Sequence, residues 1–157
     1  MTDLDIIEIT QSRLGDKAAE IANPAPRRIF ITVEPQNLVA VVDGLKKEIG
    51  LWYLAAISGV DLGDHFEILY HFGHDNGSLT VRTRIPRAQP QVESLSPVIP
   101  GAVLYERELQ DMFGIIINHI PDARPLVLPD GWPAGNFPLR KDWTHERTPE
   151  IIPGGKK

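Results

Sequence analysis

The first part of the chain alternates between segments with helical and with strand periodicity. Apolar residues keep a roughly helical spacing across residues 4–22, which predicts a helix that ends before Pro24. Residues 28–34 alternate apolar and polar side chains as a strand does, and residues 37–49 then carry an apolar stripe with helical spacing. The pattern therefore predicts a helix, a strand and an amphipathic helix, in that order.

Three further segments, at residues 51–60, 64–73 and 78–85, are rich in β-branched and aromatic residues. The turn sequences Leu62-Gly63-Asp64 and Asp75-Asn76-Gly77 separate them, which predicts an antiparallel meander with one apolar and one mostly polar face. The expected fold class is α+β. We predict a two-layer sandwich with a mainly antiparallel four-stranded sheet of β-α-β-β-β order, an N-terminal helix, a later helix and a Pro-rich extended C-terminal arm.

Proline divides the chain into two parts, because 11 of its 14 prolines lie at or after Pro86. Since proline interrupts helices and central strands, the long helix expected in this part lies between Gly101 and Gly114, with Gly114 as its C-cap. An apolar run and a stretch rich in proline and tryptophan follow. We therefore predict an α+β domain at residues 1–114 and an extended segment, called the C-terminal arm, at residues 115–157.

Composition narrows the chemistry that the chain can perform. Its 157 residues fit one domain with an appended arm, and 16 Lys and Arg against 21 Asp and Glu give a formal charge of −5, which argues against binding nucleic acid. With no cysteine, the chain lacks ligands for a thiolate iron–sulfur cluster, so we expect any redox centre in a partner. No run reaches the roughly 18 apolar residues of a membrane span, and the first residues are acidic, so we expect a cytosolic chain with no direct membrane insertion.

The histidines do not form an obvious metal site. His65 and His71 lie six residues apart on one strand face, about 20 Å in an extended chain, and His74 falls in a turn. The motifs GxGxxG, GxxxxGK[ST], GxSxG and HExxH are all absent from the sequence. These observations favour a binding or structural module over an enzyme.

The densest charge cluster contains Glu106, Arg107, Glu108 and Asp111. The two glutamates are about 200° apart around a helix, which excludes a paired-carboxylate mechanism, whereas Arg107 and Asp111 have the spacing of an i,i+4 ion pair on a solvated face. The stretch at residues 121–143 weakens that interpretation, since it has five prolines and two tryptophans and is too apolar for a free tail. Docking on a partner, packing over the domain's own sheet and a small-molecule site remain open for this stretch.

The residues around this cluster resemble a known family. The string ERELQDMFGI at residues 106–115, followed by PDAR at 121–124, LVLP at 126–129 and PLRKDW at 138–143, resembles the signature of the complex I family of the NADH dehydrogenase 30 kDa subunit. The β-α-β-β-β pattern is also similar to that family's domain. The same family supplies subunits to energy-converting nickel–iron hydrogenases, formate hydrogenlyase-type complexes and deazaflavin-dependent dehydrogenases, and the tryptophan loop at 131–137 resembles the hydrogenase-related branch.

The resemblance implies a cofactor-free subunit of a redox-driven, ion-pumping membrane complex, held peripherally on the cytoplasmic side of the cell membrane. In this hetero-oligomer its partners would be the large catalytic subunit and iron–sulfur subunits, which would carry the iron–sulfur clusters and, in a hydrogenase, a nickel–iron site. The alternatives are the equivalent subunit of an NADH or deazaflavin:quinone oxidoreductase, a free adaptor domain and an independent small-molecule enzyme.

The resemblance also implies which residues form the interface with the large subunit. The junction of domain and arm would contain Glu106, Arg107, Glu108, Asp111, Met112, Phe113 and Gly114. The arm would contribute Pro121, Asp122, Arg124, Leu128, Pro129, Trp132, Pro138, Leu139, Arg140, Lys141, Asp142 and Trp143. Because Arg140 and Asp142 share one side of an extended chain, we expect them to bind complementary charges on that subunit together, while the arm contributes little to the stability of the domain.

Overall fold

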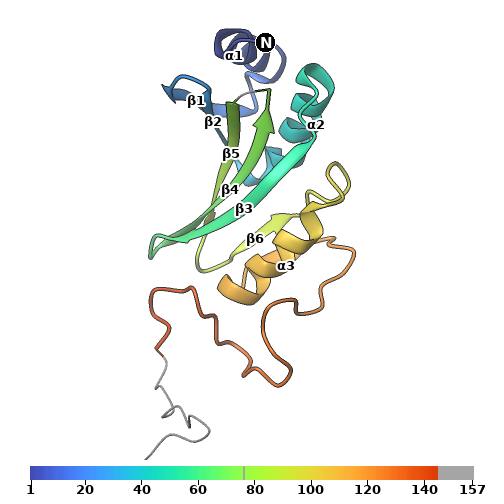
Figure 1. Ribbon diagram of the computed structural model, residues 1–157. Helices are drawn as coiled ribbons and strands as arrows, with labels where there is room; N and C mark the ends of the chain where they lie inside the picture. Colours follow the sequence, from blue (N-terminus) through green and yellow to red (C-terminus); the bar gives the residue numbers. More distant parts are fainter. Residues whose placement is uncertain (76, 145–157) are drawn as a thin grey trace, which may run out of the picture.

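The computed structural model describes residues 1–75 and 77–144 as an α+β fold with a five-stranded sheet (Figure 1). The elements in chain order are α1 (Asp3–Leu14), β1 (Ala18–Ala25), β2 (Arg28–Val33), the 3-10 helix η1 (Pro35–Asn37), α2 (Leu38–Ile49), β3 (Tyr53–Asp61), β4 (His65–His74), β5 (Gly77–Pro86), β6 (Gln91–Glu93), α3 (Ala102–Phe113) and β7 (Ile116–Asn118). The sheet has the order β1-β2-β5-β4-β3, with β2 and β5 parallel and the other neighbours antiparallel. The predicted class is therefore confirmed, although the main sheet has one strand more than the four expected and β6 and β7 form a second, two-stranded sheet.

The additional strand replaces the second half of the predicted N-terminal helix. A capping box between Thr2 and Asp5 starts α1, but the helix ends at Leu14, so the predicted helix over residues 4–22 is wrong beyond that point. Gly15 weakens helix continuation, and the free edge of β2 offers backbone partners to the residues that follow. Pairing with β2 therefore overrides the weak helical spacing of this segment.

Strand β2 and helix α2 form as predicted and supply much of the core. The apolar stripe of α2 is buried throughout, at Leu38, Val41, Val42, Leu45 and Ile49. It joins a core cluster with the apolar face of the sheet, where the aromatic and aliphatic residues of β4 are at most 1% exposed. Burial of each large apolar side chain contributes about 1.5–3 kcal/mol. Helices α1 and α2 lie toward one end of the sheet and α3 toward the other (Figure 1).

Strands β3, β4 and β5 form the predicted meander. At the first turn the N–H of Leu62 donates to the carbonyl of His65 at 3.0 Å. Gly63 there adopts a φ of +97°, a conformation that glycine tolerates best. The second predicted turn contains Asn76, which lies outside the described residues, and His74 and Gly77 pair on either side of it.

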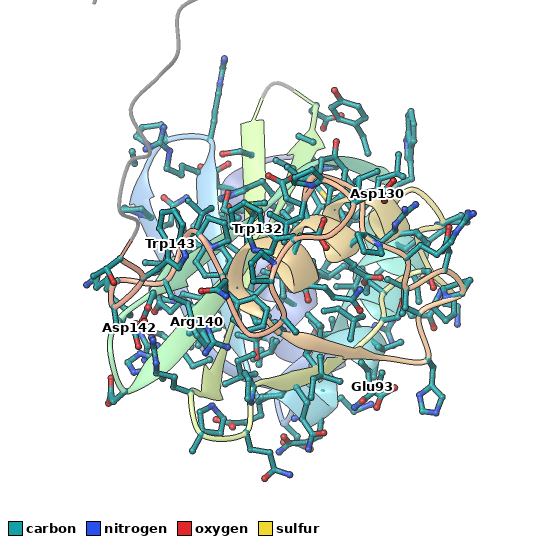
Figure 2. The ribbon with its side chains drawn as sticks, turned by 90° about the horizontal axis from the view of Figure 1, so that it is seen from below. Glu93, Asp130, Trp132, Arg140, Asp142 and Trp143 are labelled. Atoms are coloured by element: carbon teal, nitrogen blue, oxygen red, sulfur yellow. The ribbon has the colours of Figure 1, made fainter. Side chains whose placement is uncertain are left out.

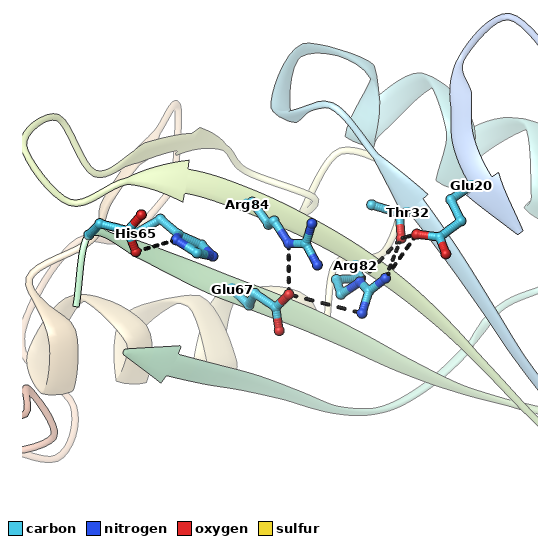
Figure 3. Close-up of polar contacts among 7 residues, drawn as sticks. Glu20, Thr32, His65, Glu67, Arg82 and Arg84 are labelled. Carbon is cyan, nitrogen blue, oxygen red and sulfur yellow. Dashed lines mark hydrogen bonds and ion pairs between the residues drawn. The ribbon is translucent and has the colours of Figure 1, made fainter. Parts of the chain in front are cut away.

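The other face of the sheet carries a chain of paired polar side chains (Figure 3). Arg82 on β5 reaches Glu20 on β1 at 3.3 Å and donates to the hydroxyl of Thr32 on β2 at 2.8 Å. Arg84 donates to Glu67 on β4 at 2.8 Å. The charges on this face are thus paired with one another across four strands.

Beyond Pro86 the chain forms β6, α3 and β7 at one end of the domain, and the arm follows them. Helix α3 occupies the predicted interval and ends at Gly114, whose φ is +66°. Strand β7 then pairs in parallel with β6, and Ile115 and Ile117 are only 1% and 4% exposed. The core therefore extends three residues past residue 114, and residues 119–144 follow without helix or strand.

Candidate functional site

The C-terminal arm passes beneath α3, and polar side chains of the domain bind its backbone (Figure 1). Asp111, in the last turn of α3, is 7% exposed. Its Oδ2 accepts hydrogen bonds from the backbone N–H groups of Leu126, Val127 and Leu128 at 2.8, 2.7 and 3.2 Å. Hydrogen bonds to an ionised acceptor are roughly twice as strong as those between neutral groups, so this carboxylate fixes three consecutive residues of the arm.

Arg107, one helical turn before Asp111, binds the preceding segment. Its Nε and Nη2 donate to the carbonyls of Arg124 and Pro125 at 2.7 and 2.9 Å. Its Nη1 approaches Asp122 at 3.3 Å, and Arg124 also donates twice to that carboxylate. These hydrogen bonds, chiefly those from Arg124, hold the pKa of Asp122 well below its usual range. Helix α3 thus binds residues 122–128 through the cationic side chain of Arg107 and the anionic side chain of Asp111.

A second anchor holds the distal part of the arm. Asp61, at the end of β3, is 4% exposed and accepts hydrogen bonds from the N–H of Lys141 and the N–H of Gly63, both at 2.9 Å. Arg87 donates to Asp61 through Nη1 and to Asp142 through Nη2, the latter at 2.5 Å. Burial by itself raises the pKa of Asp61, but the hydrogen bonds from Arg87 and the two N–H groups outweigh it and lower the pKa to about 2. Asp61 is therefore ionised at neutral pH and tied to the arm.

Gly114 permits the close approach of the arm to the end of α3. A Cβ at this position would lie 2.3 Å from the ring of Phe137. The N–H of Leu139 donates to the carbonyl of Met112 at 3.1 Å, and Nε of Arg140 donates to the carbonyl of Phe113 at 2.6 Å. The last carbonyls of the helix thus find donors in the arm, which satisfies groups that a helix end otherwise leaves unpaired.

The tryptophan loop at residues 131–137, between these anchors, is closed by a hydrogen bond within the loop. The indole Nε1 of Trp132 donates to the carbonyl of Asn136 at 2.8 Å. The rings of Trp132 and Trp143 lie 6.4 Å apart between centroids, and Figure 2 labels both in the view of the molecule from below. The loop therefore has a defined shape within this chain.

Apolar side chains of the arm point away from the domain. Leu126, Val127 and Leu139 are 44%, 52% and 54% exposed, although hydrogen bonds fix their backbone N–H groups. Leu128 is half-buried and packs against the core. The arm thus presents an ordered surface of extended chain with exposed aliphatic residues, which is a geometry suited to docking.

Glu106 serves a different junction from the one expected. It is fully buried, accepts the N–H of Leu95 at 2.6 Å and the hydroxyl of Ser94 at 2.7 Å, and so joins α3 to the loop after β6. Burial raises the pKa of Glu106, against the opposing effect of these two hydrogen bonds. The interpretation of a solvated helix face is therefore wrong for Glu106 and for Asp111.

One further expectation about a charged pair is wrong. Arg107 and Asp111 do not pair with each other, because each binds a separate part of the arm. Asp142 is bonded to Arg87, and Nε of Arg140 to the carbonyl of Phe113, so both residues also tie the arm to the core. Binding of Arg140 and Asp142 to charges on the large subunit stays a prediction, as does the small contribution of the arm to the stability of the domain.

The remaining predicted interface residues divide by exposure. Met112, Phe113 and Gly114 are enclosed by this chain and support the arm. Direct contact with a partner stays a prediction for the residues that the structure leaves exposed or half-exposed: Glu108, Pro121, Asp122, Arg124, Leu128, Pro129, Trp132, Pro138, Leu139, Arg140, Lys141, Asp142 and Trp143.

Sequence reasoning missed Asp61 and Arg87. Asp61 meets the N–H of Lys141 across 80 residues, and Arg87 reaches Asp142 across 55. Neither residue stands in a recognisable motif. The available signal was an aspartate at the end of an apolar strand and an arginine after Pro86, which does not identify a partner so distant in the chain.

Within residues 1–75 and 77–144, no group of three His, Asp or Glu side chains is arranged to hold a metal ion. His65 pairs with Asp64 at 2.6 Å, and Nδ1 of His71 lies 3.0 Å from the hydroxyl of Thr80. In the same part of the chain, none of the helices has the length and apolar character needed to cross a membrane.

Two curated relatives match most of this chain. Formate hydrogenlyase subunit 5 of Escherichia coli is 38% identical over 121 residues, which are 73% of this chain but 21% of that protein. A subunit of the F(420)H(2) dehydrogenase of Methanosarcina mazei is 34% identical over 142 residues, which are 88% of this chain and 89% of that protein. The chain therefore spans about a fifth of the first relative and nearly all of the second.

A solved structure shares the fold. A chain of the membrane-bound sulfane sulfur reductase, an archaeal respiratory membrane complex, superimposes with a TM-score of 0.79 at 22% identity, covering 90% of this chain and 85% of that one. The family model of the respiratory-chain NADH dehydrogenase 30 Kd subunit matches residues 31–149, which include α2, strands β3 to β7, α3 and the anchored part of the arm. With most of its length matched, the chain belongs to the family of the 30 Kd subunit of respiratory-chain NADH dehydrogenase.

Proposed function

We propose that this chain is a cofactor-free structural subunit in the peripheral part of a complex I-like, membrane-bound, redox-driven ion-pumping complex. Its role is to support the large catalytic subunit by docking the C-terminal arm on it. Iron–sulfur clusters, and a nickel–iron site in the hydrogenase branch, belong to partner subunits at the cytoplasmic side of the membrane. The absence of cysteine from all 157 residues supports this division, because a thiolate cluster cannot be ligated here.

The observation that carries this proposal is the arm with a fixed backbone and exposed aliphatic side chains. Asp111 holds the N–H groups of residues 126–128, yet Leu126 and Val127 remain 44% and 52% exposed. A segment already held in an extended conformation loses little conformational entropy on binding. Burial of its side chains in a partner then contributes about 25 cal/mol per Å² of apolar surface before the costs of association.

The branch of the family is the finer part of the proposal. The 38% identity to formate hydrogenlyase subunit 5 supports an energy-converting nickel–iron hydrogenase. The second candidate is the equivalent subunit of a respiratory NADH or deazaflavin:quinone oxidoreductase. The 34% identity to the F(420)H(2) dehydrogenase subunit over 88% of this chain favours this candidate.

Purification of the tagged chain from membranes of its native host tests the proposal. We expect it to recover a large subunit and iron–sulfur subunits, with nickel in the hydrogenase case and iron without nickel in the quinone case. Leu126→Asp places a charge on the docking surface and should lower recovery of these subunits at least tenfold. Leu4→Asp is the matched control, since Leu4 is 77% exposed on α1 at the other end of the molecule (Figure 1).

The proposal fails if the wild-type chain recovers no redox subunits. The docking role of the arm fails if Leu126→Asp recovers them as well as Leu4→Asp does. Equal circular dichroism spectra and melting temperatures of the two variants establish that any difference arises from docking and not from unfolding.

A further inference from the structure

Arg140 occupies an unusual position at the junction of core and arm. Its guanidinium lies over the ring of Phe137, with the central carbon 4.3 Å from the ring centroid, and 5.5 Å from the centroid of Phe66. Its Nε donates to the carbonyl of Phe113 at 2.6 Å. Ring contacts engage the flat face of a guanidinium, so this arrangement fixes its plane while leaving the edge with the terminal amino groups available.

The terminal amino groups of Arg140 have no hydrogen-bond acceptor among residues 1–75 and 77–144. The nearby carboxylates are engaged elsewhere. Asp61 accepts hydrogen bonds from Arg87, Lys141 and Gly63, and Asp142 is bonded to Arg87. Arg140 is therefore a half-buried cation with a fixed orientation, and its four terminal N–H donors have no acceptor in the described part of the chain.

A small cavity of about 190 Å³ lies beside this edge. The residues that line it are Gly135, Asn136, Phe137, Arg140, Asp142, Trp143 and Thr144. Figure 2 shows Arg140, Asp142 and Trp143 on the face of the molecule that carries the arm. The cavity has room for the carboxylate of a side chain and the methylene groups that carry it.

The local charge favours an anion. Arg87 is bonded to both carboxylates at this end of the arm, Asp61 and Asp142. Arg140 is the second cation there, and its terminal amino groups have no acceptor among the described residues. Asp142 opposes a second carboxylate in the cavity, but its bond to Arg87 at 2.5 Å offsets most of its charge.

We propose that Arg140 is the receptor for a carboxylate of the partner subunit, an Asp or Glu side chain that enters this cavity and accepts two parallel hydrogen bonds from its terminal amino groups. The inference rests on the proposed docking of the arm. It adds the polar contact that would make this docking specific for one site on the partner. A planar guanidinium with fixed orientation matches the two oxygens of a carboxylate, which a compact ammonium group cannot do. The aliphatic residues at 126, 127 and 139 then supply apolar contact around this polar centre.

Arg140→Lys combined with a zero-length carbodiimide reagent tests the inference in the assembled complex. This reagent joins an amine to a carboxylate in direct contact, and arginine does not react. We expect the variant to assemble, with association about tenfold weaker than wild type, and to form an isopeptide bond between position 140 and an Asp or Glu of the partner. Mass spectrometry identifies the bond, and wild-type protein is the control that lacks it.

A link from position 140 only to Asp61 or Asp142 of the same chain, or no link to the partner in an assembled complex, overturns the inference. Arg140→Gln gives a second measurement, since it removes the charged guanidinium group but keeps a polar side chain with the same carbons as far as Cδ. Recovery of the partner should fall by more than tenfold relative to wild type, and by more than the fall for Arg140→Lys. Equal recovery by Arg140→Gln and wild type also overturns it.

Failure of the docking proposal is distinguishable from failure of this inference. If the wild-type chain recovers no partner, the proposed function fails and the cross-link is not formed in any variant. If wild type assembles, Leu126→Asp does not, and Arg140→Gln does, then docking holds while the carboxylate receptor is wrong. Thermal unfolding of each isolated variant corrects for the loss of the contacts that Arg140 makes with Phe113 and Phe137.

Discussion

The α+β domain and the C-terminal arm place their apolar and charged contacts in opposite ways: the domain buries apolar side chains, whereas buried charged side chains hold the arm. In the domain, apolar side chains of α2 and of the sheet are buried, and charged residues such as Arg82 and Glu67 pair on the open face of the sheet. In the arm the charged contacts lie inside, with Asp111 and Asp61 both under 10% exposed, while Leu126 and Val127 face outward. A segment without regular secondary structure is thus held by ionic contacts with its backbone, and its apolar side chains remain available.

This difference has a physical cause. Strands and helices satisfy their own backbone groups, so the domain can be stabilised by apolar burial. The prolines of the arm prevent such pairing, and its backbone N–H groups need acceptors from elsewhere. Carboxylates on α3 and β3 supply them. Breaking an ionic anchor should therefore affect the arm far more than breaking a charged pair on the sheet.

The largest expected effect is that of Asp111→Ala. The change removes the shared acceptor of three backbone N–H groups, and we expect a loss of roughly 4 kcal/mol in the free energy of unfolding, with release of residues 122–128. Denaturant unfolding and limited proteolysis measure both. Glu108→Ala, three residues earlier on an exposed face of the same helix, is the control and should change stability by less than about 0.5 kcal/mol. Similar effects of the two would contradict the anchoring role of Asp111.

Gly114→Ala should have the next largest effect, and Gly50→Ala is its matched control. Both glycines are helix C-caps with positive φ, +66° and +68°, but an added Cβ meets the Phe137 ring at Gly114 and nothing within 4 Å at Gly50. The backbone conformation alone costs roughly 1 kcal/mol with alanine, so Gly50→Ala should lose about that amount. Steric conflict with Phe137 should raise the loss for Gly114→Ala to about 3 kcal/mol. Equal melting temperatures of the two variants would show that the arm does not pack there.

Asp61 should make the stability of the fold sensitive to acid. Because the pKa of Asp61 falls to about 2 in the folded state from an ordinary 3.8, its ionised form stabilises the fold above pH 4, and that stabilisation is lost as the pH falls toward 2. The shift corresponds to about 2 kcal/mol. Denaturant unfolding of wild type between pH 5 and pH 2.5 should show this loss. In Asp61→Asn the pH-dependent decrease should be smaller by that amount, and a decrease equal to that of wild type would contradict the role of Asp61.

The smallest expected effect concerns the open face of the sheet. Arg84 is 52% exposed and pairs with Glu67, and exposed ion pairs contribute little because water screens them. We expect Arg84→Ala to lower the free energy of unfolding by less than about 0.5 kcal/mol. A loss above 2 kcal/mol would mean that the ladder in Figure 3 stabilises the sheet as strongly as the anchors stabilise the arm.

Structural features that depend on residues close together in the sequence could be predicted from it. The apolar stripe of α2, the meander and the interval of α3 follow from local periodicity and turn residues, and all form as predicted. Strand β1 could not be predicted, because residues 18–25 have no strong strand pattern and become a strand by pairing with β2. Tertiary contacts override weak local preference in such segments.

The contacts of the candidate site were even harder to predict, because they join residues that are distant in the sequence. The residues of the arm and of α3 could be singled out from their family-like strings, but not the direction of their contacts. Glu106 and Asp111 differ by only five positions, yet one binds the loop after β6 and the other binds the arm. Asp61 and Arg87 lie far from the arm in sequence, so only the folded chain brings them to Lys141 and Asp142.

Hydrogen exchange of the isolated chain tests most directly whether the domain itself holds the arm in place. We predict that the amides of Leu126, Val127, Leu128 and Lys141 exchange at least about a hundredfold more slowly than those of an unstructured peptide, because Asp111 and Asp61 accept their hydrogen bonds. Asp111→Asn should abolish protection at residues 126–128 and leave Lys141 protected. Exchange of these amides at unstructured rates in the wild-type chain would contradict the pre-ordered arm, and with it the docking surface.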